Sequence, residues 1–135
     1  MFLVDTNIWL ERLLEQEKSK EVADFLNKTK SDKLFITDFT FHTICVIMSK
    51  HKLYDDLLRF VQDIFINGAV NMVCLSPADT KNISKTMIAY DIDFDDAYQY
   101  ESAIKYNLAI VSFDRDYDKT KLGRKTPNEI LNKSI

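Results

Sequence analysis

The opening stretch MFLVDTNIWL constrains the fold most strongly, because an apolar strand there ends on a carboxylate. Phe2, Leu3 and Val4 form an unbroken apolar run, which is typical of a parallel strand covered on both faces. In open sheets of parallel strands, ligands bind outside the carboxyl ends of the strands, so Asp5 is a candidate functional residue. Asp is also a preferred helix N-cap, and a helix comes directly after it, so capping is the structural alternative for Asp5.

The composition predicts one globular domain. A chain of 135 residues with 46% hydrophobic residues is long enough for a single sizeable core, so we expect one domain over residues 1–135. The sequence contains neither an apolar run of membrane-spanning length nor a basic leader, which favours a cytoplasmic protein that does not enter a membrane. Cys45 and Cys74 lie among apolar neighbours without C-x-x-C spacing, so we expect two buried thiols.

Short apolar strands alternate with amphipathic helices along the rest of the chain. Further strands are predicted at residues 33–37, 70–75 and 108–112, with a poor edge strand around 121–125. Helices are predicted at 19–30, 40–52, 53–67 and 76–90, from about Asp95 onward, and after Thr126 at the end. Helices 40–52 and 53–67 form either a hairpin or one bent helix. This alternation predicts an α/β fold with a mainly parallel sheet.

Four acidic residues fall at strand ends or at a helix start. Asp5 ends the first strand, Asp96 opens the helix that leads into the fourth, and Asp114 and Asp116 come after the fourth. If the first and fourth strands are parallel neighbours, these carboxylates converge and repel one another unless a cation neutralises them. Carboxylates are ligands that Mg²⁺ and Mn²⁺ prefer. The pattern therefore predicts a metal centre that activates water for attack on a phosphodiester.

Other metal sites and reactions fit the sequence less well. The run Asp91–Asp96 begins like an EF-hand loop, but Asp96 stands where that loop needs Gly and Ser102 where it needs Glu. His42 and His51 have no partner at zinc-ligand spacing. A phosphoryl-transfer enzyme with an aspartate nucleophile is a weaker alternative, because the D-x-D pattern of such sites is interrupted by an asparagine two residues after the first acid.

A local basic run offers an RNA-binding surface in a chain whose net charge is −3. Nucleic-acid-binding proteins usually carry a basic surplus, which this chain lacks as a whole. The cations of the run are Arg115, Lys119, Lys121, Arg124 and Lys125, of which the first three are the candidate RNA-binding residues. A solvated charged loop is the structural alternative.

Several motifs together resemble the PIN-domain ribonucleases, a family that includes VapC-type toxins. The motifs are D-T-N at Asp5–Asn7, I-T at Ile36–Thr37, F-x-D-A at Phe94–Ala97, S-x-D-x-D-Y at Ser112–Tyr117 and T-P-x-E at Thr126–Glu129. The resemblance covers nearly the whole chain. It implies a three-layer α/β/α sandwich with a short, mainly parallel sheet of four to five strands, and RNA cleavage that depends on Mg²⁺ or Mn²⁺. A homodimer and a small antitoxin partner are also implied.

The resemblance further implies roles for individual residues. Asp5, Asp96 and Asp114 match the catalytic, metal-binding acids, and Asp116 matches a nearby auxiliary acid. Two polar residues, Asn7 and Ser112, match positions that support the site through hydrogen bonds.

One position departs from the family pattern. The family usually has a glutamate about where Thr43 stands, in the helix after the second strand. Asp38 or Glu11 are candidate substitutes through a water molecule, whereas His42 is expected to pack beside Phe41 rather than bind metal. The missing acid leaves an alternative open: a catalytically weak or inactive PIN-like module that binds RNA or a protein partner.

Overall fold

A computed structural model of the chain describes residues 1–133 and contains one sheet of four parallel strands. The strands are β1 (Phe2–Val4), β2 (Leu34–Thr37), β3 (Asn71–Val73) and β4 (Ala109–Val111), in the order β3-β2-β1-β4. The first and fourth strands are neighbours, with Leu3 opposite Ile110 and Val4 opposite Val111. The sheet therefore brings the ends of β1 and β4 together, which is the arrangement that the predicted convergence of the acids depends on.

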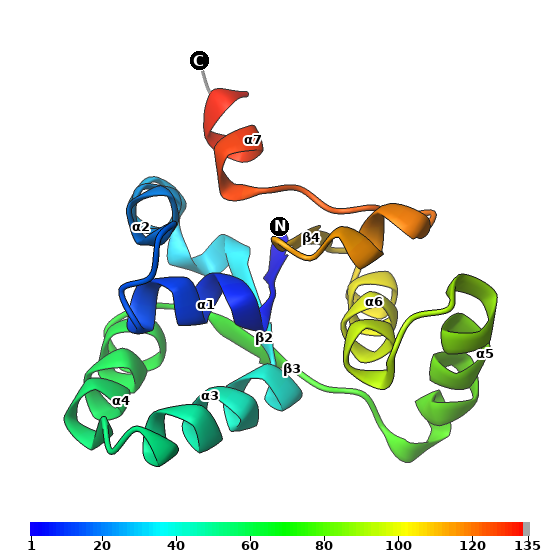
Figure 1. The fold of residues 1–135 in the computed structure, drawn as a ribbon, viewed down its shortest axis with the longest axis horizontal. Helices are drawn as coiled ribbons and strands as arrows, with labels where there is room; N and C mark the ends of the chain where they lie inside the picture. The colour runs from blue at the N-terminus through cyan, green and yellow to red at the C-terminus, as the bar shows by residue number, and fades with distance from the viewer. Residues whose placement is uncertain (134–135) are drawn as a thin grey trace.

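Helices cover both faces of this sheet and make three layers (Figure 1). One face carries α1 (Thr6–Leu13), α2 (Ser19–Lys28), α3 (Asp38–Lys50), α4 (Tyr54–Val61) and α7 (Pro127–Asn132); the other carries α6 (Phe94–Tyr106) with α5 (Thr80–Tyr90) packed behind it. Short helical turns are η1 (Ser31–Lys33), η2 (Gln62–Ile66), η3 (Pro77–Asp79) and η4 (Arg115–Lys119). The α/β/α sandwich expected from the sequence is confirmed.

Side chains of β1 alternate between two cores, as the pleat of a strand requires. Val4 packs with Trp9, Phe25 and the other apolar residues under α1–α4, whereas Leu3 packs with Ile110 and the inner face of α6. Both Leu3 and Val4 are fully buried. A strand buried on both faces has consecutive apolar residues in place of alternating apolar and polar ones. The first strand could therefore be predicted from its sequence.

Three helices that start near the carboxyl ends of the strands have side-chain caps. Asp5 accepts a hydrogen bond from the Thr6 amide at 2.9 Å, and Asp93 accepts one from the Asp96 amide at 3.0 Å. At the start of α3, the Thr37 hydroxyl accepts from the amide of residue 40 at 3.0 Å. Asp5 therefore does cap a helix, and its carboxylate remains a candidate functional group as well.

Two details differ from the sequence expectations, the edge strand and the burial of the thiols, and the structure decides between the alternatives left open for residues 40–67. The edge strand around 121–125 is reduced to a single bridge between Lys125 and Val111. Residues 40–67 form two separate helices, α3 and α4, joined by a turn in which Lys52 has a positive φ of 56°. Cys74 is exposed and Cys45 only half-buried, so the prediction of two buried thiols is wrong. Cys74 comes after β3, an edge strand with a neighbour on one side only, which explains its exposure.

No helix within residues 1–133 is both long and apolar enough to cross a membrane.

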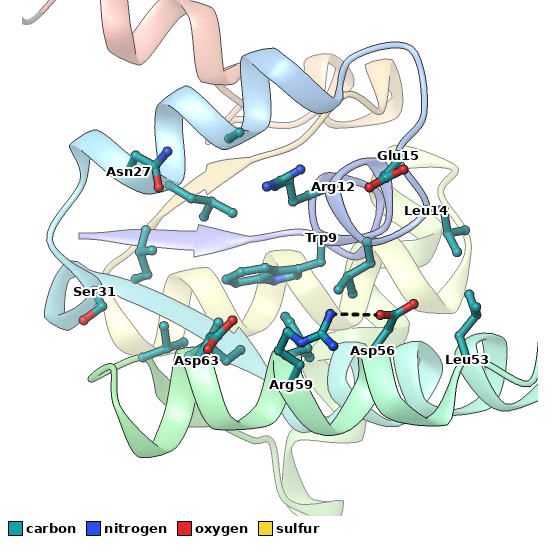
Figure 2. A pocket seen from close by; sticks show the side chains of 17 residues that line it. Trp9, Arg12, Leu14, Glu15, Asn27, Ser31, Leu53, Asp56, Arg59 and Asp63 are labelled. Atoms are coloured by element: carbon teal, nitrogen blue, oxygen red, sulfur yellow. Dashed lines mark hydrogen bonds and ion pairs between the residues drawn. The ribbon is translucent and has the colours of Figure 1, made fainter.

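An apolar groove of about 680 Å³ runs between α1, α2 and α4 (Figure 2). Trp9 forms its floor, buried by an edge-to-face contact with Phe60 and by a hydrogen bond from its indole N–H to the Val4 carbonyl at 3.2 Å. The apolar walls include Leu13, Leu26, Leu53 and Ile64. Charged side chains, among them Arg12, Glu15, Asp56 and Arg59, lie around the apolar surface. The groove contains none of the acids at the ends of β1 and β4.

Candidate metal centre

Three of the four predicted acids, Asp5, Asp96 and Asp114, line a smaller pocket of about 220 Å³ at the carboxyl ends of β1 and β4. The start of α6 closes one side of this pocket and contributes Asp96, while α3 contributes Thr43 and Phe39. The lining also includes Asp5, Thr6, Asn7, Leu10, Asp95, Gln99 and Asp114. Residues far apart in the sequence are therefore brought to one place by the parallel pairing of β1 with β4.

Three carboxylates form a tight cluster. One oxygen each from Asp96, Asp114 and Asp116 lie within 4.8 Å of one another, and this is the only such group of potential metal ligands in residues 1–133. Asp96 is 8% exposed and the other two are half-buried. The geometry brings together three of the four predicted metal-binding acids, and Asp5 lies outside this tight group.

Asp5 is held in place by four hydrogen-bond donors. Its Oδ1 accepts from the Thr6 amide at 2.9 Å and from Gln99 Nε2 at 3.1 Å. Its Oδ2 accepts from the Ser112 hydroxyl at 2.6 Å and, at a longer 3.5 Å, from Asn7 Nδ2. The carboxylate is 6% exposed yet lines the pocket, so it is a rigid negative group at the rear of the acid cluster.

Asn7 and Ser112 connect Asp5 to the end of β4. Asn7 Nδ2 donates to the Ser112 hydroxyl at 3.1 Å, and Asn7 Oδ1 accepts from the Phe113 amide at 3.2 Å. The Ser112 hydroxyl also accepts from the Asp114 amide at 3.0 Å. Asn7 and Ser112 thus link the Asp5 carboxylate to the end of β4 through hydrogen bonds.

Burial raises the pKa of the two most enclosed acids. Burial is the largest cause for Asp96, and repulsion from Asp114 and other carboxylates adds to it, so its pKa is about 7 instead of the ordinary 3.8. For Asp5, burial also raises the pKa, against the hydrogen bonds that lower it. Carboxylates crowded in this way favour either a proton or a cation.

The donor set fits a hard divalent cation. Three carboxylate oxygens lie within 4.8 Å of one another, and two of these carboxylates, those of Asp96 and Asp114, line a pocket open to solvent. This arrangement matches Mg²⁺ or Mn²⁺ held by carboxylates and water. No histidine or cysteine joins the group in residues 1–133, so the chemistry does not favour zinc. Near these acids, the buried Tyr117 hydroxyl has no hydrogen-bond partner, so the polar groups around the cluster are incompletely satisfied.

The expected substitutes for the missing acid point elsewhere. Asp38 accepts hydrogen bonds from the Tyr98 hydroxyl and the Phe39 amide, and Glu11 accepts from the Lys18 amide. Neither is among the residues that line the pocket. His42 is exposed, with its ring 6.1 Å from that of Phe41. Thr43 does line the pocket, and its hydroxyl donates to the Phe39 carbonyl at 2.9 Å.

Sequence reasoning missed two residues of the pocket, Asp95 and Gln99. Gln99 is 3% exposed and bridges two strand ends: it accepts from the Thr37 hydroxyl at 2.7 Å and donates to Asp5. It lies three residues after Asp96 on α6, and this spacing on a helix was the signal that could have identified it. Asp95 lines the pocket from the exposed side of the same helix start.

The candidate RNA-binding cations lie on or beside η4. Arg115, Lys119 and Lys121 are all exposed. Lys119 lies 3.6 Å from a carboxylate oxygen of Asp116, so it borders the acid cluster directly. Arg124 instead pairs with Asp118 and donates to the Ser112 carbonyl, which ties it to the loop. Lys119 therefore lies next to the acids, while Arg115 and Lys121 are exposed on the same segment of the chain.

A glutamate at position 43 should strengthen metal binding. Thr43→Glu adds a carboxylate to the pocket, and its attraction for a cation, reduced by desolvation, amounts to about 1 kcal/mol, or roughly fivefold in affinity. Calorimetric titration with Mn²⁺ measures this change. His42→Glu is the matched control, because its exposed neighbouring side chain is not part of the pocket. Equal Mn²⁺ affinities of folded Thr43→Glu and wild type would contradict the prediction.

The fold and site define an α/β domain that gathers acids at the ends of adjacent parallel strands. The chain matches the PIN domain over residues 2–122 and belongs to that family. No curated protein is similar enough in sequence to count as a relative. Thr43, which stands where the family usually has a glutamate, lies within the residues that match the family.

Solved structures similar to this chain include a toxin and a toxin–antitoxin complex. VapC20 of Mycobacterium tuberculosis, a toxin that cleaves the sarcin–ricin loop, has a TM-score of 0.78 and 11% identity over 94% of this chain and 100% of that chain. A toxin–antitoxin complex from Klebsiella pneumoniae has a TM-score of 0.75 and 19% identity over 94% and 98%. FitAcB from Neisseria gonorrhoeae has a TM-score of 0.73 and 18% identity, also over 94% and 98%. At these identities the likeness establishes the shared fold.

Proposed function

We propose that this chain is a cytoplasmic, metal-dependent endoribonuclease and the toxin of a toxin–antitoxin pair. The observation that carries the proposal is the cluster of Asp96, Asp114 and Asp116, whose oxygens lie within 4.8 Å of one another at an open pocket that Asp96 and Asp114 line. Membership in the PIN domain family and the fold shared with toxins support it.

Each group has a role in this proposal. Asp96, Asp114 and Asp116 hold Mg²⁺ or Mn²⁺, with Asp5 adding negative charge from behind them. A divalent ion bound there would activate water and polarise a phosphoryl oxygen. Asn7 and Ser112 hold the Asp5 carboxylate in a fixed position relative to the end of β4 through hydrogen bonds. The exposed cations Arg115, Lys119 and Lys121 bind the RNA phosphates beside the acids.

The test is cleavage of a labelled single-stranded RNA by the purified chain. We expect cleavage with Mn²⁺ or Mg²⁺, none after EDTA treatment, and none of a DNA of the same sequence. Cleavage that persists in EDTA would contradict the metal-dependent mechanism.

A second candidate function rests on Thr43. Because a neutral side chain lines the pocket where the family usually has an acid, the centre has less negative charge to hold a metal ion. The alternative is a PIN-like module that binds RNA or a protein and cleaves slowly or not at all. RNA binding by gel shift without cleavage at saturating Mn²⁺ would favour this alternative.

We propose that the antitoxin docks in the groove between α1, α2 and α4. The groove offers about 680 Å³ of volume, an apolar floor at Trp9 and charged groups around it, which suits an amphipathic helix. Its separation from the pocket means that a partner can be held there without entering the acid cluster.

The proposal also includes a homodimer, to be tested by light scattering.

A charge placed in the groove should weaken antitoxin binding. Ala23 is half-buried in the groove wall on α2, so Ala23→Glu puts a carboxylate against the partner's apolar face and should cost about tenfold or more in affinity. The measurement is calorimetry with the antitoxin that the proposal requires, identified by its co-purification with this chain. Ile88→Glu is the control, because Ile88 is 83% exposed on α5 and outside the groove. Equal losses in both variants would rule out the groove.

A further inference from the structure

One buried polar atom is left without a partner in residues 1–133, the hydroxyl of Tyr117. Tyr117 is completely buried, although most buried tyrosine hydroxyls in proteins form a hydrogen bond. An unpaired buried donor is unfavourable, so its presence calls for a physical explanation. Such an atom commonly marks a place where an ion, water or ligand completes the arrangement.

The Tyr117 ring is fixed, and its hydroxyl faces acids. The ring packs on the α6 side of the sheet with Leu3, Tyr100 and Ile110. Burial and the nearby carboxylates, Asp96 among them, raise the pKa of the hydroxyl. A tyrosine hydroxyl is in any case a hydrogen-bond donor at neutral pH. Tyr117 also comes directly after Asp116 on η4, the turn that Asp114 caps.

The Asp96 carboxylate is the matching acceptor. The backbone amide of Asp96 donates to the Asp93 cap, and a carboxylate oxygen of Asp96 lies within 4.8 Å of one from Asp116, the residue next to Tyr117 in the chain. Asp5 accepts four hydrogen bonds. Tyr117 lies near enough to Asp96 to lower the pKa of that acid. A buried hydroxyl without a hydrogen-bond partner of ordinary geometry therefore lies close to the largely buried carboxylate of Asp96.

We propose that Tyr117 is a positioning residue of the metal centre, whose hydroxyl donates to the Asp96 carboxylate and holds it in the orientation that binds a divalent cation. The inference rests on the proposed metal-dependent function and adds to it a residue beyond the acids. Groups that donate a hydrogen bond to a metal-binding side chain commonly contribute to metal affinity, because they limit the orientations that this side chain can adopt.

The test compares Tyr117→Phe with Tyr100→Phe by calorimetric titration with Mn²⁺. Tyr117→Phe should weaken Mn²⁺ binding about tenfold and leave the metal-free melting temperature unchanged or higher, because it removes only an unpaired hydroxyl. Tyr100→Phe is the matched control: Tyr100 is buried in the same core, but its hydroxyl contacts that of Tyr90 at 3.4 Å. It should keep wild-type affinity.

A spectroscopic readout checks the same hydrogen bond without a cleavage assay. Mn²⁺ should produce a near-ultraviolet tyrosine difference spectrum in wild type and in Tyr100→Phe, and none in Tyr117→Phe. Wild-type Mn²⁺ affinity in Tyr117→Phe, or an equal loss in both variants, would overturn the role of Tyr117 while leaving the proposed function in place. Absence of Mn²⁺ binding by the wild type would overturn both.

Discussion

Asp96→Asn should abolish metal-dependent RNA cleavage while leaving the chain folded. Asp96 is the most enclosed member of the acid cluster, and its amide analogue keeps the shape but loses the charge that binds the cation. A metal centre contributes several kcal/mol to stabilising the transition state, so we expect a loss of about 100- to 1,000-fold. Single-turnover cleavage of a labelled RNA at saturating Mn²⁺ measures the effect.

Asp91→Asn is the control for this substitution. Asp91 is an exposed aspartate five residues before Asp96, at the end of α5, where it has a positive φ of 52°. Asn adopts this backbone conformation as readily as Asp does. Asp91→Asn should therefore cleave at the wild-type rate. Equal activity of Asp96→Asn and wild type would mean that the cleavage comes from another site or from a contaminant.

The metal-free protein should lose stability as the pH rises from about 4 to about 7. The pKa of Asp96 is about 7 in the folded chain against an ordinary 3.8, because burial and neighbouring carboxylates disfavour its charge. Between these two values the folded chain binds a proton that the unfolded chain does not, so raising the pH favours unfolding. The full difference between the two pKa values corresponds to a change of about 4 kcal/mol in the free energy of unfolding. Because solvent in the open pocket screens the charge, we expect a change of about 2 kcal/mol.

Metal binding should show the opposite pH dependence. The cation binds the ionised carboxylate, so a proton competes with it, and Mn²⁺ affinity should fall about tenfold for each pH unit below about 7. Urea unfolding in EDTA at about pH 5 and about pH 8, with Mn²⁺ titrations at the same pH values, measures both trends. Asp96→Asn should flatten the stability profile. A metal-free wild type that is more stable at the higher pH would contradict the assignment.

The positions of the acids were readable from the sequence because the backbone of a parallel sheet dictates them. A short apolar strand such as Phe2–Val4 must be buried on both faces, and the next residue, Asp5, must lie at the carboxyl edge of the sheet. The same reasoning applied to Asp114, which lies just beyond β4. The pairing of β1 with β4 then brings the two ends together.

The position of Thr43 was also accessible from the sequence. The resemblance to the family implied that Thr43 stands where a glutamate usually lines the site, and Thr43 does line the pocket from α3. The sequence could not exclude Asp38 and Glu11 as substitutes, because their partners, Tyr98 and the Lys18 amide, are set by packing between elements.

The sequence by itself determined the fold class and the family, and it identified the acids, because burial on both faces of short strands and motifs at strand ends are local properties of the chain. Only the tertiary structure decided which groups touch. It placed Gln99 on Asp5, left Asp5 outside the tight cluster and opened the groove beside Trp9. It also left the Tyr117 hydroxyl unpaired beside the acids. These features depend on distances between residues remote in sequence, which side-chain packing sets and no local pattern encodes.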